Sequence, residues 1–282
     1  MSKAKYAGTK FDLPSDKWFW NKCGELDSIV EFQECTHLSF IQSFKNDGNG
    51  RSFGDYCEEI AGKYHVKLGV FSVTDYKETL YATYLITSFA SFDNFLLRFK
   101  EDAKCLGINL KLKEWKLVGK RKVKLPFFEQ ICNALKSKGI VPHFEKWNKE
   151  LLKYYKQRRN VVAHHLNKSD YIKSLQNVQK YRNDLLKRYP SITNAIQNTG
   201  DLSFDDFILC TANLKNIAHI MSISLENHIN WNKVGKRKPS FIDYIEINKI
   251  HFDKQKQINI IRKNVEMMFG ISLTDKECNA FL

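Results

Sequence analysis

The residues best suited to chemistry lie in the segment 157–165, which reads QRRNVVAHH. Arg159, Asn160 and His164 place a guanidinium, an amide and an imidazole close together along one helix. An imidazole titrates near neutral pH and can accept the proton of a ribose 2′-hydroxyl. A guanidinium binds a phosphate with paired donors, and an amide can orient either group. The three residue types therefore suit cleavage of a phosphodiester without a metal ion.

The spacing decides how these groups can meet. Asn160 and His164 are four residues apart, which places them on one face of a helix. Arg159 and His164 are five apart, so their side chains leave an ideal helix about 140° from each other. They can converge only near the end of the helix or by reaching around a common groove.

An arginine followed four to six residues later by a histidine is a weak pattern. With the Arg and His content of this chain, about 0.8 matches are expected by chance. The alternative interpretation is a solvated arginine pair and a terminal histidine that the helix dipole favours. The context of the pattern must decide between the two.

That context resembles the HEPN (higher eukaryotes and prokaryotes nucleotide-binding) superfamily, whose members share an all-helical bundle with an RNxxxH-type motif near the end of one core helix. Residues 159–164 match as RNVVAH. The segment 88–96, SFASFDNFL, is similar to an earlier family helix that carries an acidic residue. Asp93 takes that position, where glutamate is more usual. The resemblance covers roughly residues 75–230 and is diffuse outside these two segments.

The resemblance implies a metal-independent endoribonuclease for single-stranded or loop RNA, acting by 2′-hydroxyl attack. Arg159 and His164 would be catalytic. Asn160 would support them, and Asp93 would orient Arg159 through a hydrogen bond. The products would be a 2′,3′-cyclic phosphate and a 5′-hydroxyl. Family ribonucleases generally form homodimers in which two motifs face one cleft, so the partner chain would bring the second set of groups.

The neighbouring Arg158 and His165 are ambiguous, because spacings of four to six residues all occur in the family. We prefer Arg159 and His164 because Asn160 follows Arg159 directly. For Arg158 and His165 we expect contacts with RNA. The resemblance also implies a toxin or anti-phage defence role, with an antitoxin or another regulatory partner.

One departure from the family concerns regulation. Leu166 stands two residues after His164, where toxins paired with nucleotidyltransferase antitoxins carry a tyrosine. Modification of such a tyrosine is therefore not expected here. Many family members also lack nuclease activity, so a non-catalytic RNA-binding or scaffold protein on a HEPN-like bundle is the alternative. A helical DNA-binding protein is a third interpretation.

The charge pattern indicates a polyanionic partner. The chain carries a formal net charge of +14, of which residues 1–97 contribute −3 and residues 98–282 contribute +17. A basic region on a globular chain most often binds nucleic acid and sometimes an anionic membrane surface. Of these two we expect RNA and no membrane.

A basic segment at 108–126, INLKLKEWKLVGKRKVKLP, alternates charged and apolar residues and predicts a hairpin or an extended loop. We expect Lys120, Arg121 and Lys122 to contact RNA. Trp115 would stack on a base. The alternative is an edge hairpin that its lysines protect from aggregation.

Composition and periodicity predict a mainly α protein. Apolar residues make up 43% of the chain and aromatic residues 13%, which excludes disorder of the whole chain. Helices are expected over 25–45, 75–107, 127–139, 143–165, 170–189, 203–229 and about 253–269. We expect a HEPN-like helical bundle with a small basic hairpin or loop insertion, organised as a partly helical extension over 1–74, a core over 75–230, and a basic loop and helix over 231–282 packed on the core.

No metal, cofactor or membrane segment is expected. The seven cysteines are scattered without a CxxC pair, and Cys35 and His37 lack further zinc ligands at suitable spacing. Reduced cysteines, and the lack of an apolar run typical of a signal peptide, favour a cytoplasmic protein. His219 lies on an apolar helix and is interpreted as a core histidine.

Overall fold

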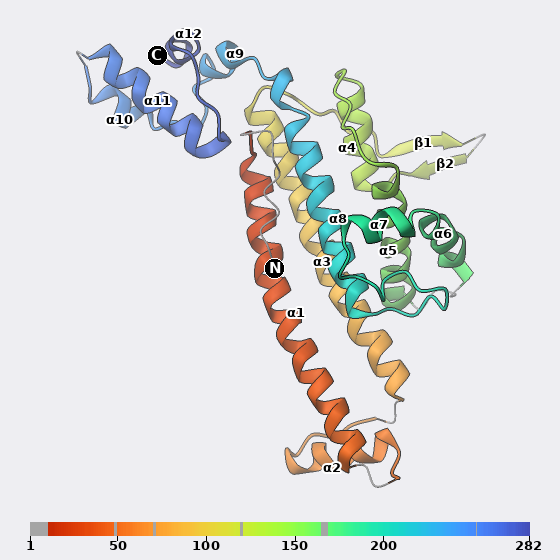
Figure 1. Ribbon diagram of the computed structural model, residues 1–282. Helices are drawn as coiled ribbons and strands as arrows, with labels where there is room; N and C mark the ends of the chain where they lie inside the picture. The colour runs from red at the N-terminus through yellow and green to blue at the C-terminus, as the bar shows by residue number, and fades with distance from the viewer. Residues whose placement is uncertain (1–10, 48–49, 70–71, 119–120, 165–168, 252) are drawn as a thin grey trace. The chain divides into compact units, whose positions relative to one another are not determined.

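The structure, a computed structural model, describes residues 11–47, 50–69, 72–118, 121–164, 169–251 and 253–282. Within these residues the chain is mainly helical, with one two-stranded antiparallel sheet (Figure 1). The elements in chain order are α1 (Pro14–Asp47), α2 (Phe53–Lys63), α3 (Val73–Cys105), β1 (Trp115–Val118), β2 (Arg121–Lys124), α4 (Phe127–Lys136), α5 (Lys146–His164), α6 (Ser169–Gln179), α7 (Arg182–Arg188), α8 (Phe204–Ile223), η1 (Glu226–His228), α9 (Trp231–Gly235), α10 (Tyr244–Asn248), α11 (Lys254–Phe269), α12 (Asp275–Cys278) and η2 (Asn279–Phe281). The predicted mainly α fold class is confirmed.

Two compact units make up the fold, and each combines segments that are distant in sequence. Unit 1 comprises the chain up to Asn21 together with Phe92–Phe144 and Lys215–Leu282, and unit 2 comprises Lys22–Ser91 and Glu145–Leu214. The helices α1, α3 and α8 contribute to both units. The units therefore cross the boundaries at residues 74 and 230 that the sequence suggested.

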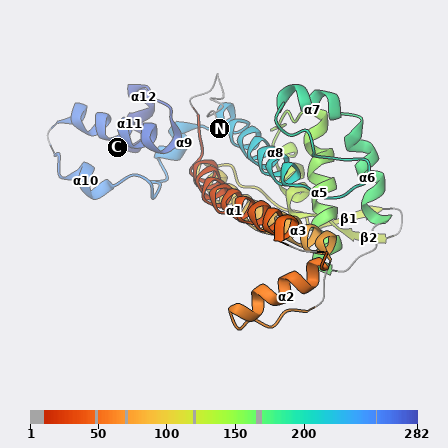
Figure 2. The ribbon, with the colours of Figure 1, turned by 60° about the horizontal axis from the view of Figure 1, so that its bottom comes forward.

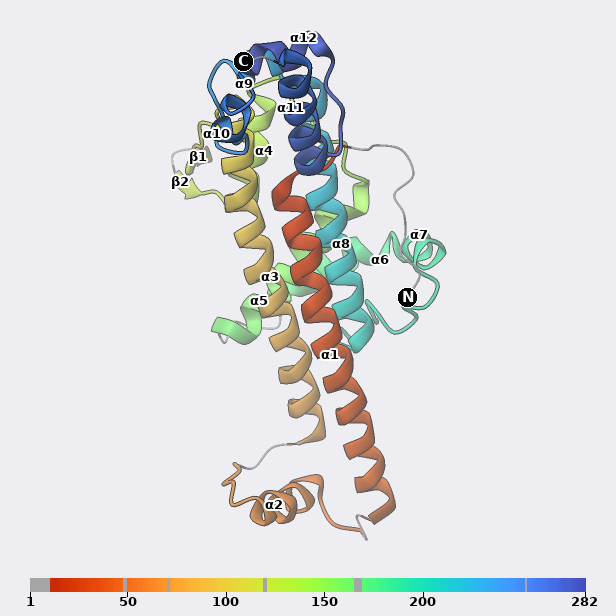
Figure 3. The same cartoon turned by 90° about the vertical axis from the view of Figure 1, so that its left-hand side faces the viewer.

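Aromatic packing between α1 and α3 forms the core of unit 1, where the two helices run side by side (Figures 1 and 3). The Phe19 ring centre lies 5.9 Å from that of Phe92 and 5.3 Å from that of Phe95. Phe128 of α4 adds a further ring 6.1 Å from Phe92. Burial of these rings supplies the main driving force for joining the segments. The 3–4 residue apolar period of α3 thus predicts the buried face correctly.

Polar contacts hold α5 against α8 in unit 2. Asn148 donates from Nδ2 to Oδ1 of Asn213 at 2.8 Å, and Asn213 donates to the Asn148 carbonyl at 3.1 Å. The Tyr155 hydroxyl donates to Oδ1 of Asp206 at 3.0 Å, while the Ser203 backbone N–H donates to its Oδ2 at 2.9 Å. All but Ser203 are buried, and burial raises the pKa of the Asp206 carboxyl. Buried polar groups that satisfy one another fix the position of α5.

Further helices cover both ends of unit 2. In Figures 1 and 2, α6 and α7 lie beside α5, and the rings of Tyr154 and Tyr171 meet edge to face across α5 and α6. At the other end, α2 lies across the end of α1 (Figure 3). There the ring of Phe44 in α1 lies 5.3 Å from Phe53 and 5.5 Å from Tyr56 in α2.

Several boundaries differ from the sequence predictions. α1 extends well beyond 25–45, because Pro14 suits the first position of a helix and Asp16 supplies an acidic first turn. α5 starts at Lys146 rather than 143, and the segment predicted over 170–189 divides into α6 and α7. The alternation at 67–73 favours a strand, but Lys67–Gly69 are irregular and Val73 is already helical. Gly107 adopts φ 83°, the left-handed conformation expected after a helix.

The described part of the chain contains neither a disulfide nor a membrane-spanning helix. Its seven cysteines form no disulfide among the described residues. Among the described residues no helix combines the length and the apolar character that a membrane span needs.

A buried histidine makes unit 2 sensitive to acid. The His37 side chain is 2% exposed, and neither ring nitrogen has a hydrogen-bond partner among the described residues. Burial, and then the charge of Lys77, lowers the pKa of His37 below its usual 6.5. The unfolded chain therefore binds a proton more readily than the folded chain, so stability falls as the pH drops below 6.5 toward the folded pKa.

We expect the His37→Phe variant to lose less stability than the wild type between about pH 7.5 and about pH 5.5. Urea unfolding at the two pH values measures the difference. His228 is exposed, so His228→Phe is the matched control and should keep the dependence of the wild type. Equal losses in His37→Phe and the wild type would contradict the expectation.

Candidate functional site

The last turns of α5 carry the motif that the sequence singled out, and they belong to unit 2. α5 is helical from Lys146 to its last residue, His164, so Arg159, Asn160 and His164 follow one another on one continuous helix. The backbone of α5 therefore has the helical spacing that the sequence predicted for this motif.

The Arg159 guanidinium is held in a defined orientation. Its Nε donates to Oδ1 of Asn160 at 3.1 Å and its Nη2 to the same oxygen at 2.8 Å. Its central carbon lies 5.4 Å from the ring centre of Phe89 on α3. Arg159 is half-buried. A planar cation set between an amide and an aromatic face is oriented before any ligand arrives.

Asp93, the remaining predicted member of the catalytic group, belongs to a different unit from Arg159. Asp93 is exposed on the part of α3 that belongs to unit 1, whereas Arg159 belongs to unit 2. The hydrogen bond expected between Asp93 and Arg159 stays a prediction. His165 and Lys120, both expected to contact RNA, lie outside the described residues.

Arg158, for which an RNA contact stays a prediction, is paired and buried within unit 2. Its side chain is 2% exposed, and its Nη2 donates to Oε1 and Oε2 of Glu78 at 3.2 and 3.0 Å. Its guanidinium carbon also lies 4.2 Å from the ring centre of Tyr171. A buried guanidinium that is paired and stacked has little surface to offer to RNA. Because Arg158 and Arg159 are adjacent in the sequence, the sequence alone does not show that one is buried and the other half-buried.

The basic segment forms the predicted hairpin, and its register sorts the RNA-contact candidates onto two faces. Trp115 pairs with Lys124, Leu117 with Lys122, and Val118 with Arg121. Directly opposed residues share a face and neighbours alternate. Trp115 and Lys122 therefore point to one side, with Leu117 and Lys124, while Arg121 points to the other. Trp115 is 55% and Leu117 67% exposed, so this Trp115 face is an exposed aromatic and cationic surface.

The net positive charge lies mainly in the unit that contains the hairpin, and not in the unit that contains the arginine motif. Unit 1 contains 27 Lys and Arg against 14 Asp and Glu, a net of +13, and unit 2 contains 18 against 17, a net of +1. The unit that carries Arg159 and His164 is therefore nearly neutral. A net of +13 lets unit 1 attract polyanions over a longer range than unit 2 can.

No family model, no curated protein and no solved structure matches the chain. The resemblance to the HEPN superfamily accordingly rests on the segments 88–96 and 159–164. Phe89 of the first segment and Arg159 of the second, both in unit 2, are in contact.

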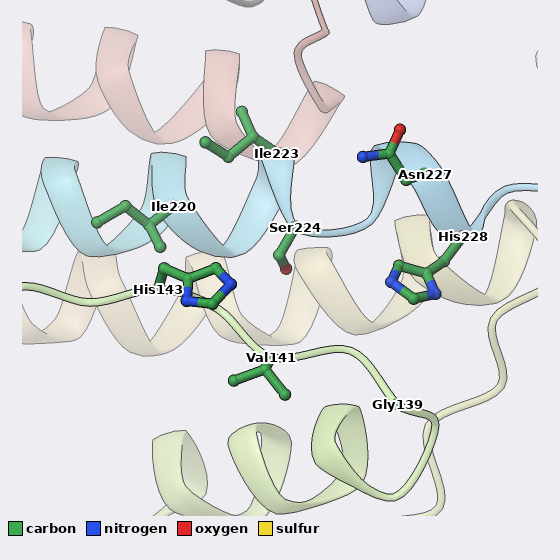
Figure 4. Close-up of a pocket in the computed structure, with 8 residues that line it drawn as sticks. All are labelled: Gly139, Val141, His143, Ile220, Ile223, Ser224, Asn227 and His228. Atoms are coloured by element: carbon green, nitrogen blue, oxygen red, sulfur yellow. The ribbon is translucent and has the colours of Figure 1, made fainter.

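A separate cavity of about 590 Å³ lies in unit 1. Figure 4 shows His143, Ser224 and His228 among the residues that line it, with Ser224 between the two imidazole rings in this view. The residues that line it include no arginine, lysine or carboxylate, and none of the predicted site residues. The cavity therefore lacks the guanidinium that the predicted chemistry requires.

Two contributors to the Arg158–Arg159 region are missed by the sequence. Phe89 fits the apolar period of its helix, which predicts core packing and not a contact with a guanidinium. Glu78 stands near the start of the same helix, 80 residues before its partner Arg158. No local pattern connects residues at that separation, so only the fold can show the pair.

Proposed function

We propose that the chain is a metal-independent endoribonuclease that cleaves single-stranded or loop RNA, with Arg159 and His164 as its catalytic residues. Asn160 positions Arg159. In keeping with the resemblance to HEPN proteins, the enzyme serves as a toxin or anti-phage defence effector under the control of a regulatory partner.

One observation carries the proposal, namely the Arg159 guanidinium fixed by Asn160 beside Phe89 at the end of the helix that closes with His164. Cleavage of RNA without a metal needs a fixed cation near the phosphate and a group that titrates near neutral pH. The end of α5 supplies both residue types.

In the proposed reaction His164 accepts the proton of the 2′-hydroxyl while the 2′-oxygen attacks the adjacent phosphorus. The bond from phosphorus to the 5′-oxygen breaks, and that oxygen leaves with a proton delivered by an acid, which leaves a 2′,3′-cyclic phosphate on one product and a 5′-hydroxyl on the other. Arg159 stabilises the charge that gathers on the phosphate oxygens in the transition state.

The angle between the two residues supports a homodimer. Residues five apart leave an ideal helix about 140° from each other, so one copy does not readily direct Arg159 and His164 at the same phosphate. Two copies related by a two-fold axis can place Arg159 of one beside His164 of the other. The second copy would then also provide the acid that protonates the leaving oxygen.

Product ends test the reaction directly. Purified chain should cut an unstructured RNA in the presence of EDTA, with folding under that condition checked by circular dichroism. The downstream fragment should accept a radioactive phosphate from polynucleotide kinase without prior phosphatase treatment, because its 5′ end is a hydroxyl. Fragments with a 5′-phosphate, or cleavage that EDTA abolishes while the chain stays folded, would overturn the proposal.

A non-catalytic RNA-binding protein is the second candidate, and the Trp115 face of the hairpin favours it. Exposed Trp115 can stack on a base, and Lys122 and Lys124 on the same face can contact phosphates. A wild type that binds RNA with strong salt dependence but cuts none of it would support this candidate over the nuclease.

The two faces of the hairpin should contribute unequally to RNA binding. We expect Trp115→Ala to weaken binding of single-stranded RNA by roughly 5- to 100-fold through lost stacking. Lys122→Ala should lower the slope of log affinity against log salt by about 0.7, one phosphate contact. Arg121→Ala is the matched control from the opposite face. Fluorescence anisotropy at several salt concentrations measures all three, and an equal loss in Arg121→Ala would show that the Trp115 face has no special role.

A further inference from the structure

Unit 1 contains a cluster of two aspartates and one histidine that the proposed function does not use. Asp16 in the first turn of α1, Asp12 just before that helix and His219 on α8 each contribute one oxygen or nitrogen, and these atoms all lie within 4.8 Å of one another. Nδ1 of His219 lies 3.1 Å from Oδ2 of Asp16. The Asp12 backbone is held in place by its N–H, which donates to the Phe269 carbonyl at 2.9 Å.

The Asp16 carboxylate is buried, and only one of its two oxygens has a hydrogen-bond partner among the described residues. Its side chain is 0% exposed, and among the described residues its Oδ1 has no hydrogen-bond partner. A buried carboxylate beside a second carboxylate is stable only if a proton or a cation neutralises the excess negative charge.

We infer that Asp12, Asp16 and His219 bind one divalent transition-metal ion, such as Zn²⁺ or Mn²⁺. Carboxylate oxygen and imidazole nitrogen bind such ions at about 2.0–2.2 Å, which places two ligand atoms of one ion roughly 3 to 3.5 Å apart. The separation of 3.1 Å between Nδ1 and Oδ2 fits that geometry. A small closing movement of the third ligand completes the set.

The combination of one imidazole and two carboxylates favours a transition-metal ion over Ca²⁺ or Mg²⁺. Ca²⁺ and Mg²⁺ prefer oxygen ligands throughout, whereas an imidazole with carboxylates suits Zn²⁺, Mn²⁺ or Fe²⁺. Three protein ligands leave at least one coordination position for water or another small molecule. The bound ion would connect the residues before α1, the first turn of α1 and α8, so its binding should stabilise unit 1. The sequence could not predict this site because His219 lies 203 residues from Asp16.

The test uses the full chain, stripped of metal by dialysis against EDTA. Titration with Co²⁺ as a spectroscopic substitute should show ligand-field absorption that saturates at one equivalent per chain, and Zn²⁺ should abolish it by competition. Zn²⁺ should also raise the unfolding midpoint. Asp16→Asn and His219→Gln should each lose at least about 100-fold in Co²⁺ affinity, since even residues outside the ligand set cost about 10- to 100-fold. Glu101→Gln and His228→Gln, exposed residues of unit 1, should bind like the wild type.

Two results would overturn the inference. One is a wild type that binds none of Co²⁺, Zn²⁺ and Mn²⁺ and whose unfolding midpoint is the same with and without these ions. A shared proton would then neutralise the cluster. The other is binding that persists in both Asp16→Asn and His219→Gln. Neither result bears on RNA cleavage, because that reaction is assayed through its product ends and its dependence on Arg159.

Discussion

Replacing Arg159 by alanine is expected to slow RNA cleavage by about 10²- to 10³-fold, because the guanidinium stabilises charge that appears only in the transition state. Replacing His164 by alanine should cost about 10²- to 10⁴-fold, the usual contribution of a general base. Single-turnover cleavage of an end-labelled RNA measures both losses. RNA binding and the unfolding midpoint should change little in Arg159→Ala, since Arg159 is only half-buried.

Graded variants separate catalysis from a general loss of charge. Arg159→Lys keeps the charge but cannot place two donors on the Asn160 oxygen, so it should recover only a small part of the activity. Lys153 is exposed on the same helix, and Lys153→Ala is the matched control that should cleave like the wild type. If Arg159→Ala and His164→Ala both cut RNA at the wild-type rate, the catalytic assignment is wrong.

Mixing the two inactive variants tests the composite site. If Arg159 of one copy acts with His164 of the other, a dimer of one Arg159→Ala chain and one His164→Ala chain retains one intact pair. Subunit exchange should then restore a measurable fraction of the activity. A mixture as inactive as its components would show that both residues must belong to the same chain or that the dimer does not exchange.

The sequence predicts well what depends on neighbouring residues. The apolar period over 75–107 predicts α3, and the basic alternation around Gly119 predicts the hairpin, because helix faces and strand pairs repeat at short, regular intervals. The position of Arg159, Asn160 and His164 near the end of a helix follows from the same periodicity. These features need no knowledge of tertiary contacts.

Long-range partners are the part that the sequence cannot predict. Arg158 and Arg159 are adjacent and chemically identical, yet Glu78 and Tyr171 bury one of them and Asn160 and Phe89 orient the other. The register of the hairpin similarly separates neighbouring Arg121 and Lys122 onto opposite faces. In each case the deciding contact comes from another element, or from another strand, and depends on the completed fold.

The buried pair of Arg158 and Glu78 should be the most sensitive polar contact of unit 2. Removing the carboxylate by Glu78→Ala leaves a guanidinium that is 2% exposed without its counter-ion. Breaking a buried pair in this way typically costs about 3–5 kcal/mol of unfolding free energy. Urea unfolding at neutral pH measures the loss. Lys77→Ala is the matched control on the neighbouring position of α3 and should cost much less.

A double-mutant cycle shows whether the loss comes from the pair itself. Arg158→Met together with Glu78→Gln removes both charges and keeps similar volumes, so the double variant should be more stable than the sum of the single losses predicts. Additive losses would mean that the contact of Arg158 with Tyr171, and not the ion pair, holds α5 in place. Variants of the two adjacent arginines should thus differ in what they lose. Arg158 variants lose stability, and lose activity only as the chain unfolds, whereas Arg159 variants lose activity in a chain that stays folded.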